Sequence, residues 1–180
     1  VSGLLIDKIG GPSVFPYHPK GLWLELNNRP NYSRPYPQGK GEALYRRSLY
    51  TYWKRTVPPP SMATFDAPER EFCLVRRSRT NTPLQAFVLL HDPQFVEAAR
   101  QLATQMMAAA KQPADRIAHG FRIVTARQPN AREQKILQRL YAERLAFYKK
   151  APKAAATLLA IGESKTTENL PAIEHAAWTP

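Results

Sequence analysis

Prolines that mark helix starts constrain the fold of this chain more than any other feature of its sequence. Thr82-Pro83 and Asp92-Pro93 each place a helix-capping residue before a proline, and proline is tolerated in the first helical turn. Gln112-Pro113 ends the second of these helices, and Pro129-Asn130 ends a third. Apolar residues recur between these breaks at the helical spacing of about 3.6 residues. They are Leu84, Phe87, Val88 and Leu90, then Phe95, Val96, Ala99, Leu102, Ala103 and Met106, then Ile117, Phe121 and Val124.

The last third of the chain continues the helical pattern. Asn130 and Glu133 have the spacing of a capping box, which predicts the start of a fourth helix. A fifth helix is expected from Pro152 to Ile161, with a stop at Gly162, and a further helix over 170–178. Short helices joined by proline-marked turns are typical of a helical bundle. The sequence therefore predicts a mainly α fold with a bundle at 82–180.

Residues 1–81 differ from the rest because they are rich in proline and glycine. We expect them to form a loop-rich, irregular arm that packs on the bundle, with a short helix near Lys20–Leu26. The run Ala43–Lys54 fits a strand as well as a helix, so its structure stays open. A length of 180 residues suits a single domain. Because the chain starts without methionine, we expect this domain to be truncated.

The charge of the chain is unusual. The formal net charge is +12 and the isoelectric point is about 10.1, while the hydrophobic content of 43% is ordinary for a globular protein. Such a balance favours anionic partners, namely nucleic acid, acidic polysaccharide, anionic lipid or an acidic protein. The alternative is that the excess charge only keeps the surface soluble.

Many of the cations lie in one stretch, Arg46–Gln85, which we call the basic segment. It holds eight Arg or Lys residues against three acids, interleaved with aromatic residues, so it is expected to bind something. The candidate anion-binding residues are Arg76, Arg77, Arg79, Asn81, Lys54 and Arg55. Three arginines directly before a helix start suit a phosphate, sulfate or carboxylate. The structural alternative, which we favour, is that these arginines bind helix-end carbonyls and the carboxylates of the segment FDAPERE.

Signals for catalysis, metals and cofactors are weak. Asp66 and Glu69 are acid/base candidates, but salt bridges with neighbouring cations explain them better. The four histidines are scattered without metal-ligand spacing, and no phosphate-binding or nucleophile motif occurs. Cys73, the single cysteine, lies in a short apolar run and is expected to be buried. We therefore predict no metal, no cofactor in this chain and no membrane span, and we name no catalytic residue.

Several motifs together resemble one family. They are KIGGPSVFPY, GLW, LYRRSLYTYWKRTVPPPSMATFDAPERE, VRRSRTNTPLQAFVLLHDPQFVEAAR and LLAIGES followed by AAW. The chain resembles the planctomycete cytochrome-associated C-terminal domain, domain of unknown function fifteen fifty-three. This resemblance implies a fragment of a larger exported protein, hence a periplasmic or extracellular location. It implies no catalytic residues, and covalent haem does not follow because the chain has no CxxCH motif.

Three functions fit these observations. The first is a non-catalytic helical module that docks neighbouring domains of the same polypeptide or an acidic glycan. The second is an enzyme acting on sulfated or uronate-rich polysaccharide, with the arginine trio binding the anionic groups. The third, an electron-transfer partner of c-type cytochrome domains, rests on the resemblance and on a basic face. Nucleic acid is an unlikely partner, because an exported protein rarely meets it.

Overall fold

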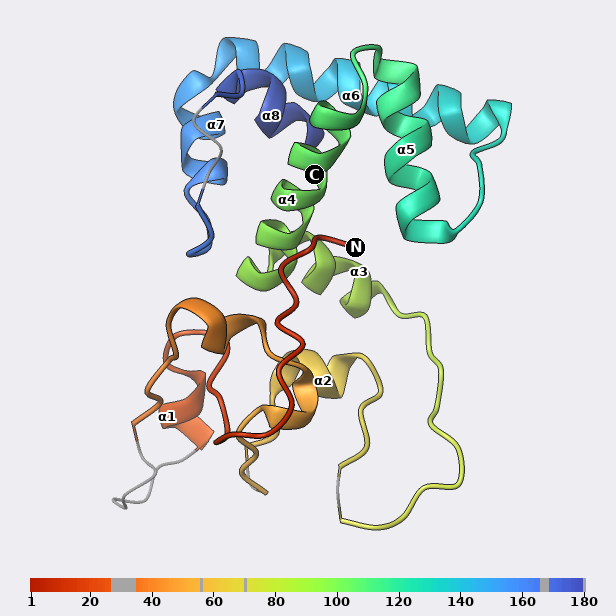
Figure 1. Cartoon of the computed structure of the whole chain (residues 1–180). Coiled ribbons are helices and arrows are strands. Elements are labelled where there is room, and N and C mark those ends of the chain that lie inside the picture. The colour runs from red at the N-terminus through yellow and green to blue at the C-terminus, as the bar shows by residue number, and fades with distance from the viewer. Residues whose placement is uncertain (27–34, 56, 70, 166–168, 180) are drawn as a thin grey trace. The chain divides into compact units, whose positions relative to one another are not determined.

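The chain forms two compact units. A computed structural model covers residues 1–180 and describes residues 1–26, 35–55, 57–69, 71–165 and 169–179 (Figure 1). One unit comprises Leu5–His91, and the other comprises Asp92–Pro180 together with Val1–Leu4. We call them the N-terminal and the C-terminal unit. The prediction of a mainly helical chain is confirmed, and the division between the units falls after His91, so the first proline-marked helix belongs to the N-terminal unit.

The C-terminal unit is a bundle of short helices (Figure 1). Its helices are α4 (Pro93–Ala109), α5 (Pro113–Thr125), α6 (Ala131–Lys150), α7 (Pro152–Leu159) and α8 (Ala172–Trp178). Helix α8 packs against α4, α6 and α7, and α5 packs against α4 and α6. The predicted capping box is confirmed, because the Asn130 side chain accepts from the Glu133 N–H and the Glu133 carboxylate accepts from the Asn130 N–H.

Two apolar clusters form the core of this unit. The first consists of Tyr148, Ala155, Leu159, Ala176 and Ala177, and the second of Ala103, Met107, Ile117 and Trp178. The alanines let α7 and α8 approach closely, and the rings of Tyr141 and Trp178 stack with their centroids 3.8 Å apart. Helix α6 therefore joins the clusters, because Tyr141 packs against both of them.

The N-terminal unit has little regular structure among its described residues. It contains α1 (Leu22–Leu26), the 3₁₀ helices η1 (Gly41–Tyr45) and η2 (Ser48–Tyr50), α2 (Pro60–Thr64) and α3 (Pro83–His91). The open question over Ala43–Lys54 is settled, since this run forms 3₁₀ turns and isolated bridges to the first residues of the unit. The bridges join Ile6 to Arg46 and Val14 to Thr51.

Aromatic side chains take the place of a sheet or bundle core in this unit. The ring of Phe15 stacks on Tyr52 with a centroid separation of 4.7 Å, and Trp23 lies 5.2 Å from Tyr36. Trp23 is 4% exposed, so its indole is buried within the cluster. Large rings bury much area per ordered residue, which helps to explain how a loop-rich segment holds together.

Arginines at the start of the basic segment hold the neighbouring backbone. Arg46 donates to the carbonyl oxygens of Lys8 and Gly10 at 2.8 and 2.7 Å, and its guanidinium lies 4.1 Å from the centroid of Tyr50. Arg47 pairs with Asp7 at 2.8 Å. These cations therefore fix the first residues of the unit onto the basic segment.

Candidate anion-binding site

The site begins at the end of α2. The Asp66 N–H donates to the Ala63 carbonyl and the Ala67 N–H to the Met62 carbonyl, which is the hydrogen-bond pattern of a Schellman motif. Asp66 has a φ of 57°, in the left-handed region that glycine usually takes at this position. Asp66 therefore has a steric strain that glycine would not have. In return, its carboxylate lies directly beyond the end of α2.

The Asp66 carboxylate binds Thr80. It accepts from the Thr80 N–H at 2.8 Å and from the Thr80 hydroxyl at 2.8 Å. These bonds, first that from the backbone N–H, lower the pKa of Asp66 below its ordinary value, and the charge of Arg77 adds to the effect. The carboxylate thus ties the loop that leads to α3 back onto the end of α2.

Arg77 closes the same junction from the other direction. Its Nε donates to the Asp66 carbonyl at 2.7 Å, and its Nη2 donates to the carbonyl of Phe65. Both oxygens lie at the end of α2, where carbonyls lack helical partners and where a cation meets the helix dipole favourably. This is the arrangement that the structural alternative predicts for one of the three arginines.

Helix α3 starts beside this junction with a second capping box. The Gln85 N–H donates to the Thr82 hydroxyl at 3.3 Å, and the Thr82 N–H donates to the Gln85 side-chain oxygen at 3.1 Å. The Gln85 amide nitrogen donates to the Thr64 carbonyl and to the Thr80 hydroxyl, each at 2.9 Å. Gln85 is 8% exposed, so this one buried side chain joins α2, the loop and α3.

A cleft of about 410 Å³ lies at this junction. It is lined by Phe65, Asp66, Gln85 and residues 76–80. Arg76 and Arg79 are exposed, and within the described part of the chain their guanidinium groups make no hydrogen bond or ion pair. The walls of the cleft are therefore held by hydrogen bonds. Its lining also includes Arg76 and Arg79, whose guanidinium groups take no part in those bonds.

The comparison with protein families matches residues 1–141 to the family described as PSD1, protein of unknown function (DUF1553). The chain belongs to the PSD1 family. The match includes the whole of the cleft and ends within α6. No curated protein and no solved structure matched the chain in the corresponding searches.

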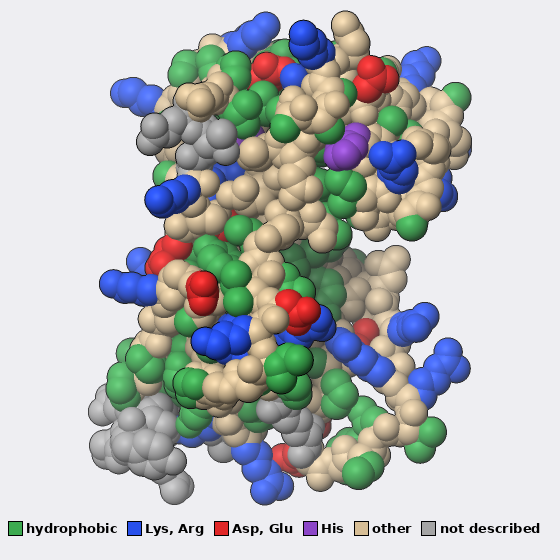
Figure 2. Space-filling model, in the orientation of Figure 1, with side chains coloured by type: hydrophobic (Ala, Val, Ile, Leu, Met, Phe, Trp, Pro, Cys, Tyr) green, Lys and Arg blue, Asp and Glu red, His purple; other side chains and the backbone are tan. Residues whose placement is uncertain are grey.

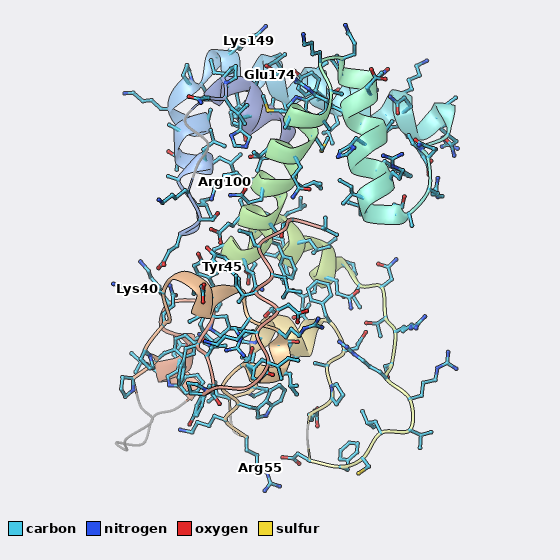
Figure 3. All side chains as sticks on the ribbon, viewed as in Figure 1. Lys40, Tyr45, Arg55, Arg100, Lys149 and Glu174 are labelled. Carbon is cyan, nitrogen blue, oxygen red and sulfur yellow. The ribbon has the colours of Figure 1, made fainter. Side chains whose placement is uncertain are left out.

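The structure brings four of the eight candidate residues of this PSD1 chain together in the cleft, namely Arg76, Arg77, Arg79 and Asp66. The other four do not line it. Lys54 lies 5.9 Å from the ring centroid of Trp23, and Arg55, labelled in Figure 3, pairs with Glu71 at 2.7 Å. Asn81 and Glu69 are exposed and lie outside the cleft lining.

Four residues that line the cleft were not among the predicted site residues, namely Phe65, Ser78, Thr80 and Gln85. Gln85 had a detectable signal, because Thr82 followed by Gln85 is a capping-box pattern of the same kind as Asn130 and Glu133. Phe65, Ser78 and Thr80 had no such signal in the sequence. Their roles depend on the return of the loop to the end of α2, and no local pattern in the sequence predicts that return.

A second polar cluster, also missed, lies buried in the C-terminal unit. Glu97 and Arg100 are 0% and 1% exposed, one turn apart on α4, and Arg100 is labelled in Figure 3. Arg100 donates to the carbonyl and the hydroxyl oxygen of Ser164, while the Ser164 N–H donates to Glu97. Burial lowers the pKa of His175, whose Nε2 lies 3.1 Å from the Arg100 carbonyl. These contacts fix the loop before α8.

The described residues contain no group of His, Cys, Asp or Glu side chains that could hold a metal ion. No described helix combines the length and the apolar character that crossing a bilayer requires. Cys73 corrects our expectation, because it is exposed rather than buried. The apolar run around it finds no core, since Phe72, Leu74 and Val75 are exposed as well.

Proposed function

We propose that this PSD1 chain is a non-catalytic binding module of an exported protein and that it holds an acidic polysaccharide in the cleft beside α2. The observation that carries the proposal is the pair Arg76 and Arg79, two exposed cations without a partner in the described residues, on the rim of a cleft that other side chains build. Guanidinium groups match carboxylates and sulfates in shape and charge, so they favour a uronate or a sulfated sugar.

The remaining lining suits a sugar. Phe65 is half-buried and lines the cleft, and an aromatic side chain there suits the apolar face of a pyranose. Arg77, Thr80 and Gln85 are bonded to the protein itself, so they hold the walls in place instead of adapting to a ligand. A preformed site saves the cost of ordering side chains on binding.

An enzyme acting on the same polysaccharide is the second candidate, because Asp66 lies in the cleft with the three arginines. Two observations weigh against it. The carboxylate of Asp66 already accepts bonds from Thr80, and its lowered pKa makes it a poor general acid near neutral pH. Glu69, the other candidate, does not line the cleft. Docking of neighbouring domains and an electron-transfer role find no specific support in the cleft.

Glycan binding tests the proposal. We expect the full chain at about 0.15 M salt to bind a sulfated glycan or a polyuronate, and the double variant Arg76→Gln, Arg79→Gln to bind it about tenfold more weakly. The melting temperature should stay unchanged, because both side chains are exposed. Isothermal titration with heparin, polygalacturonate and neutral dextran measures the affinity, and thermal denaturation controls for folding.

The matched control removes the same charge elsewhere. Arg122 and Arg132 are exposed in the C-terminal unit, so Arg122→Gln with Arg132→Gln lowers the net charge equally. We expect this control to change the affinity by less than about twofold. Equal losses in the two double variants, or binding that vanishes on raising salt to about 0.15 M, would mean generic charge attraction and would contradict the proposal. Hydrolysis of the glycan by the unmodified chain would favour the enzyme instead.

A further inference from the structure

Helix α6 carries a second apolar stripe besides the one that packs into the C-terminal unit. Tyr141, Leu145 and Tyr148 contact the core clusters. Ile136, Leu140 and Phe147 are exposed by 56%, 37% and 51%. At about 100° per residue these three lie within about 40° of each other, on the side of the helix away from Tyr141 and Leu145. The stripe extends over about 16 Å of helix.

Helix α6 carries several cations, and some of them flank this stripe. The exposed cations on α6 are Arg132, Lys135, Arg139, Arg144, Lys149 and Lys150, of which Lys149 is labelled in Figure 3. The acids on the helix are Glu133 and Glu143, and both are occupied. Glu133 pairs with Arg127 at 2.6 Å, and Glu143 pairs with Arg139 at 2.7 Å. Of the other five cations, Arg132, Arg144 and Lys150 lie within about 60° of the centre of the stripe, and α6 itself does not balance their charge. Lys135 and Lys149 lie on other sides of the helix.

We propose that this outer stripe of α6 docks an amphipathic α-helix with acidic flanks. A narrow row of large apolar side chains at helical spacing is the pattern of a helix–helix seam, and flanking charges select the partner. Acidic residues beside the partner's apolar row would lie against Arg132, Arg144 and Lys150. This docking surface is separate from the cleft, and it does not depend on glycan binding.

Two other occupants fit the stripe less well. A second copy of the chain would bring two basic helix faces together, and like charges in contact disfavour that pairing. An anionic membrane suits a basic helix, but it needs a broad apolar face. Here the stripe is narrow, and the Glu143 carboxylate lies between Leu140 and Phe147 in sequence and on the same face of the helix. An acidic helix is therefore the favoured occupant.

A peptide probe tests the proposal on the full chain. The probe is a labelled 20-residue helical peptide with leucine at the first and fourth positions of each seven and glutamate at the flanking positions. Its controls are a peptide of the same composition in scrambled order and one with lysine in place of glutamate. Fluorescence anisotropy at about 0.15 M salt should show binding of the acidic helical probe at least about tenfold tighter than either control peptide.

Variants assign the binding to the stripe. Ile136→Ser with Phe147→Ser should weaken probe binding at least about tenfold, because it removes both ends of the apolar row. The matched control is Leu49→Ser, which removes an apolar side chain that is 73% exposed in the N-terminal unit and should leave binding unchanged. Arg76→Gln with Arg79→Gln should also leave it unchanged, so failure of the glycan proposal remains distinguishable.

Each contrary result overturns the proposal. Equal binding of the helical and scrambled probes, or an unaffected Ile136/Phe147 variant, would show that the stripe is not the docking surface. Stripe-dependent dimerisation in analytical ultracentrifugation without probe binding would assign the surface to a second copy. Stripe-dependent binding to phosphatidylserine vesicles without probe binding would assign it to a membrane.

Discussion

Asp66 shows how much one residue contributes to the cleft. Its backbone occupies the left-handed position at the end of α2, where glycine would be free of strain. Its carboxylate gives two oxygens to Thr80, which lies fourteen positions further along the chain. Asp66 therefore combines a strained backbone with a side chain that binds Thr80. Only another carboxylate or an amide could make the same bonds.

Substitutions at Asp66 should separate backbone strain from side-chain bonding. We expect Asp66→Ala to lower the melting temperature most, because alanine keeps the strain and loses the bonds to Thr80. Asp66→Gly should melt several degrees higher than Asp66→Ala, since glycine removes the strain, and Asp66→Asn should stay closest to the unmodified chain. Differential scanning calorimetry gives the order, and equal melting of the alanine and glycine variants would disprove the strain.

Tyr36 makes the N-terminal unit sensitive to alkali. Its hydroxyl donates to the Pro16 carbonyl at 2.7 Å, and burial raises its pKa to about 12. The folded state thus favours the protonated phenol. The stability from this preference is complete below the unfolded pKa of about 10, and it is lost as the pH rises toward about 12.

The corresponding prediction concerns the slope of stability with pH. Between about pH 10 and pH 12 the free energy of unfolding should fall, and it should fall less steeply in Tyr36→Phe, which has no proton to lose. Urea unfolding at several pH values measures both slopes. Identical slopes would show that Tyr36 does not titrate differently in the folded state. Lysines deprotonate in the same range, so only the difference between the two proteins is informative.

At the scale of elements, α4 holds the loop before α8. Gly162 has a φ of 91°, and a Cβ built there would lie 2.3 Å from the Glu97 Cδ. Glu97 is fully buried, so it has no room to move away. The glycine is required both by the backbone conformation and by the close approach of the carboxylate that binds Ser164.

Gly162→Ala should therefore destabilise the chain by more than about 2 kcal/mol. Gly120→Ala is the matched control in the same unit. Its Cβ would meet the Sδ of Met106 at 2.6 Å, but a methionine side chain is flexible, and alanine improves the helix propensity of α5. We expect Gly120→Ala to stay within about 1 kcal/mol of the unmodified chain in urea unfolding. A Gly162→Ala variant as stable as this control would contradict the tight packing.

The elements also show which parts of the fold the sequence could predict. Helix starts at Pro83 and Pro93 were predictable because a cap and a proline act within one helical turn. The start of α6 at Ala131 was predictable from the capping box of Asn130 and Glu133. Helix α2 was not predicted. It has five residues and begins at the last of three consecutive prolines, a pattern that indicates a break in regular structure. In the cleft, the binding of helix-end carbonyls could be predicted for the run of three arginines as a group, because guanidinium groups commonly bind irregular backbone. The choice of Arg77 over Arg76 and Arg79 depends on the return of the loop to α2, which is a long-range event.

At the scale of the whole molecule, the large positive charge is partly used inside the structure. Figure 2 shows Lys and Arg side chains scattered over the face that it draws. Arg46, Arg77, Arg100 and Arg116 donate to backbone carbonyls, and so they act as structural donors. Arg116 also pairs with Glu174, which is labelled in Figure 3. A net charge counted from the sequence therefore overstates the cations that remain for partners, and it cannot tell which ones they are.

The loop that α4 holds has a consequence for variation of the sequence. Arg100, Gln101 and Glu97 bind the N–H, carbonyl and hydroxyl groups of Ser164 and the carbonyl of Lys165. Most of these partners are main-chain atoms, whose positions follow from the number of residues after α7 and not from their side chains. Apart from Gly162, natural variants should thus exchange amino acids in this loop more readily than they lengthen or shorten it. An alignment gap between α7 and Lys165 would mark a chain whose α4 has lost the buried charge pair.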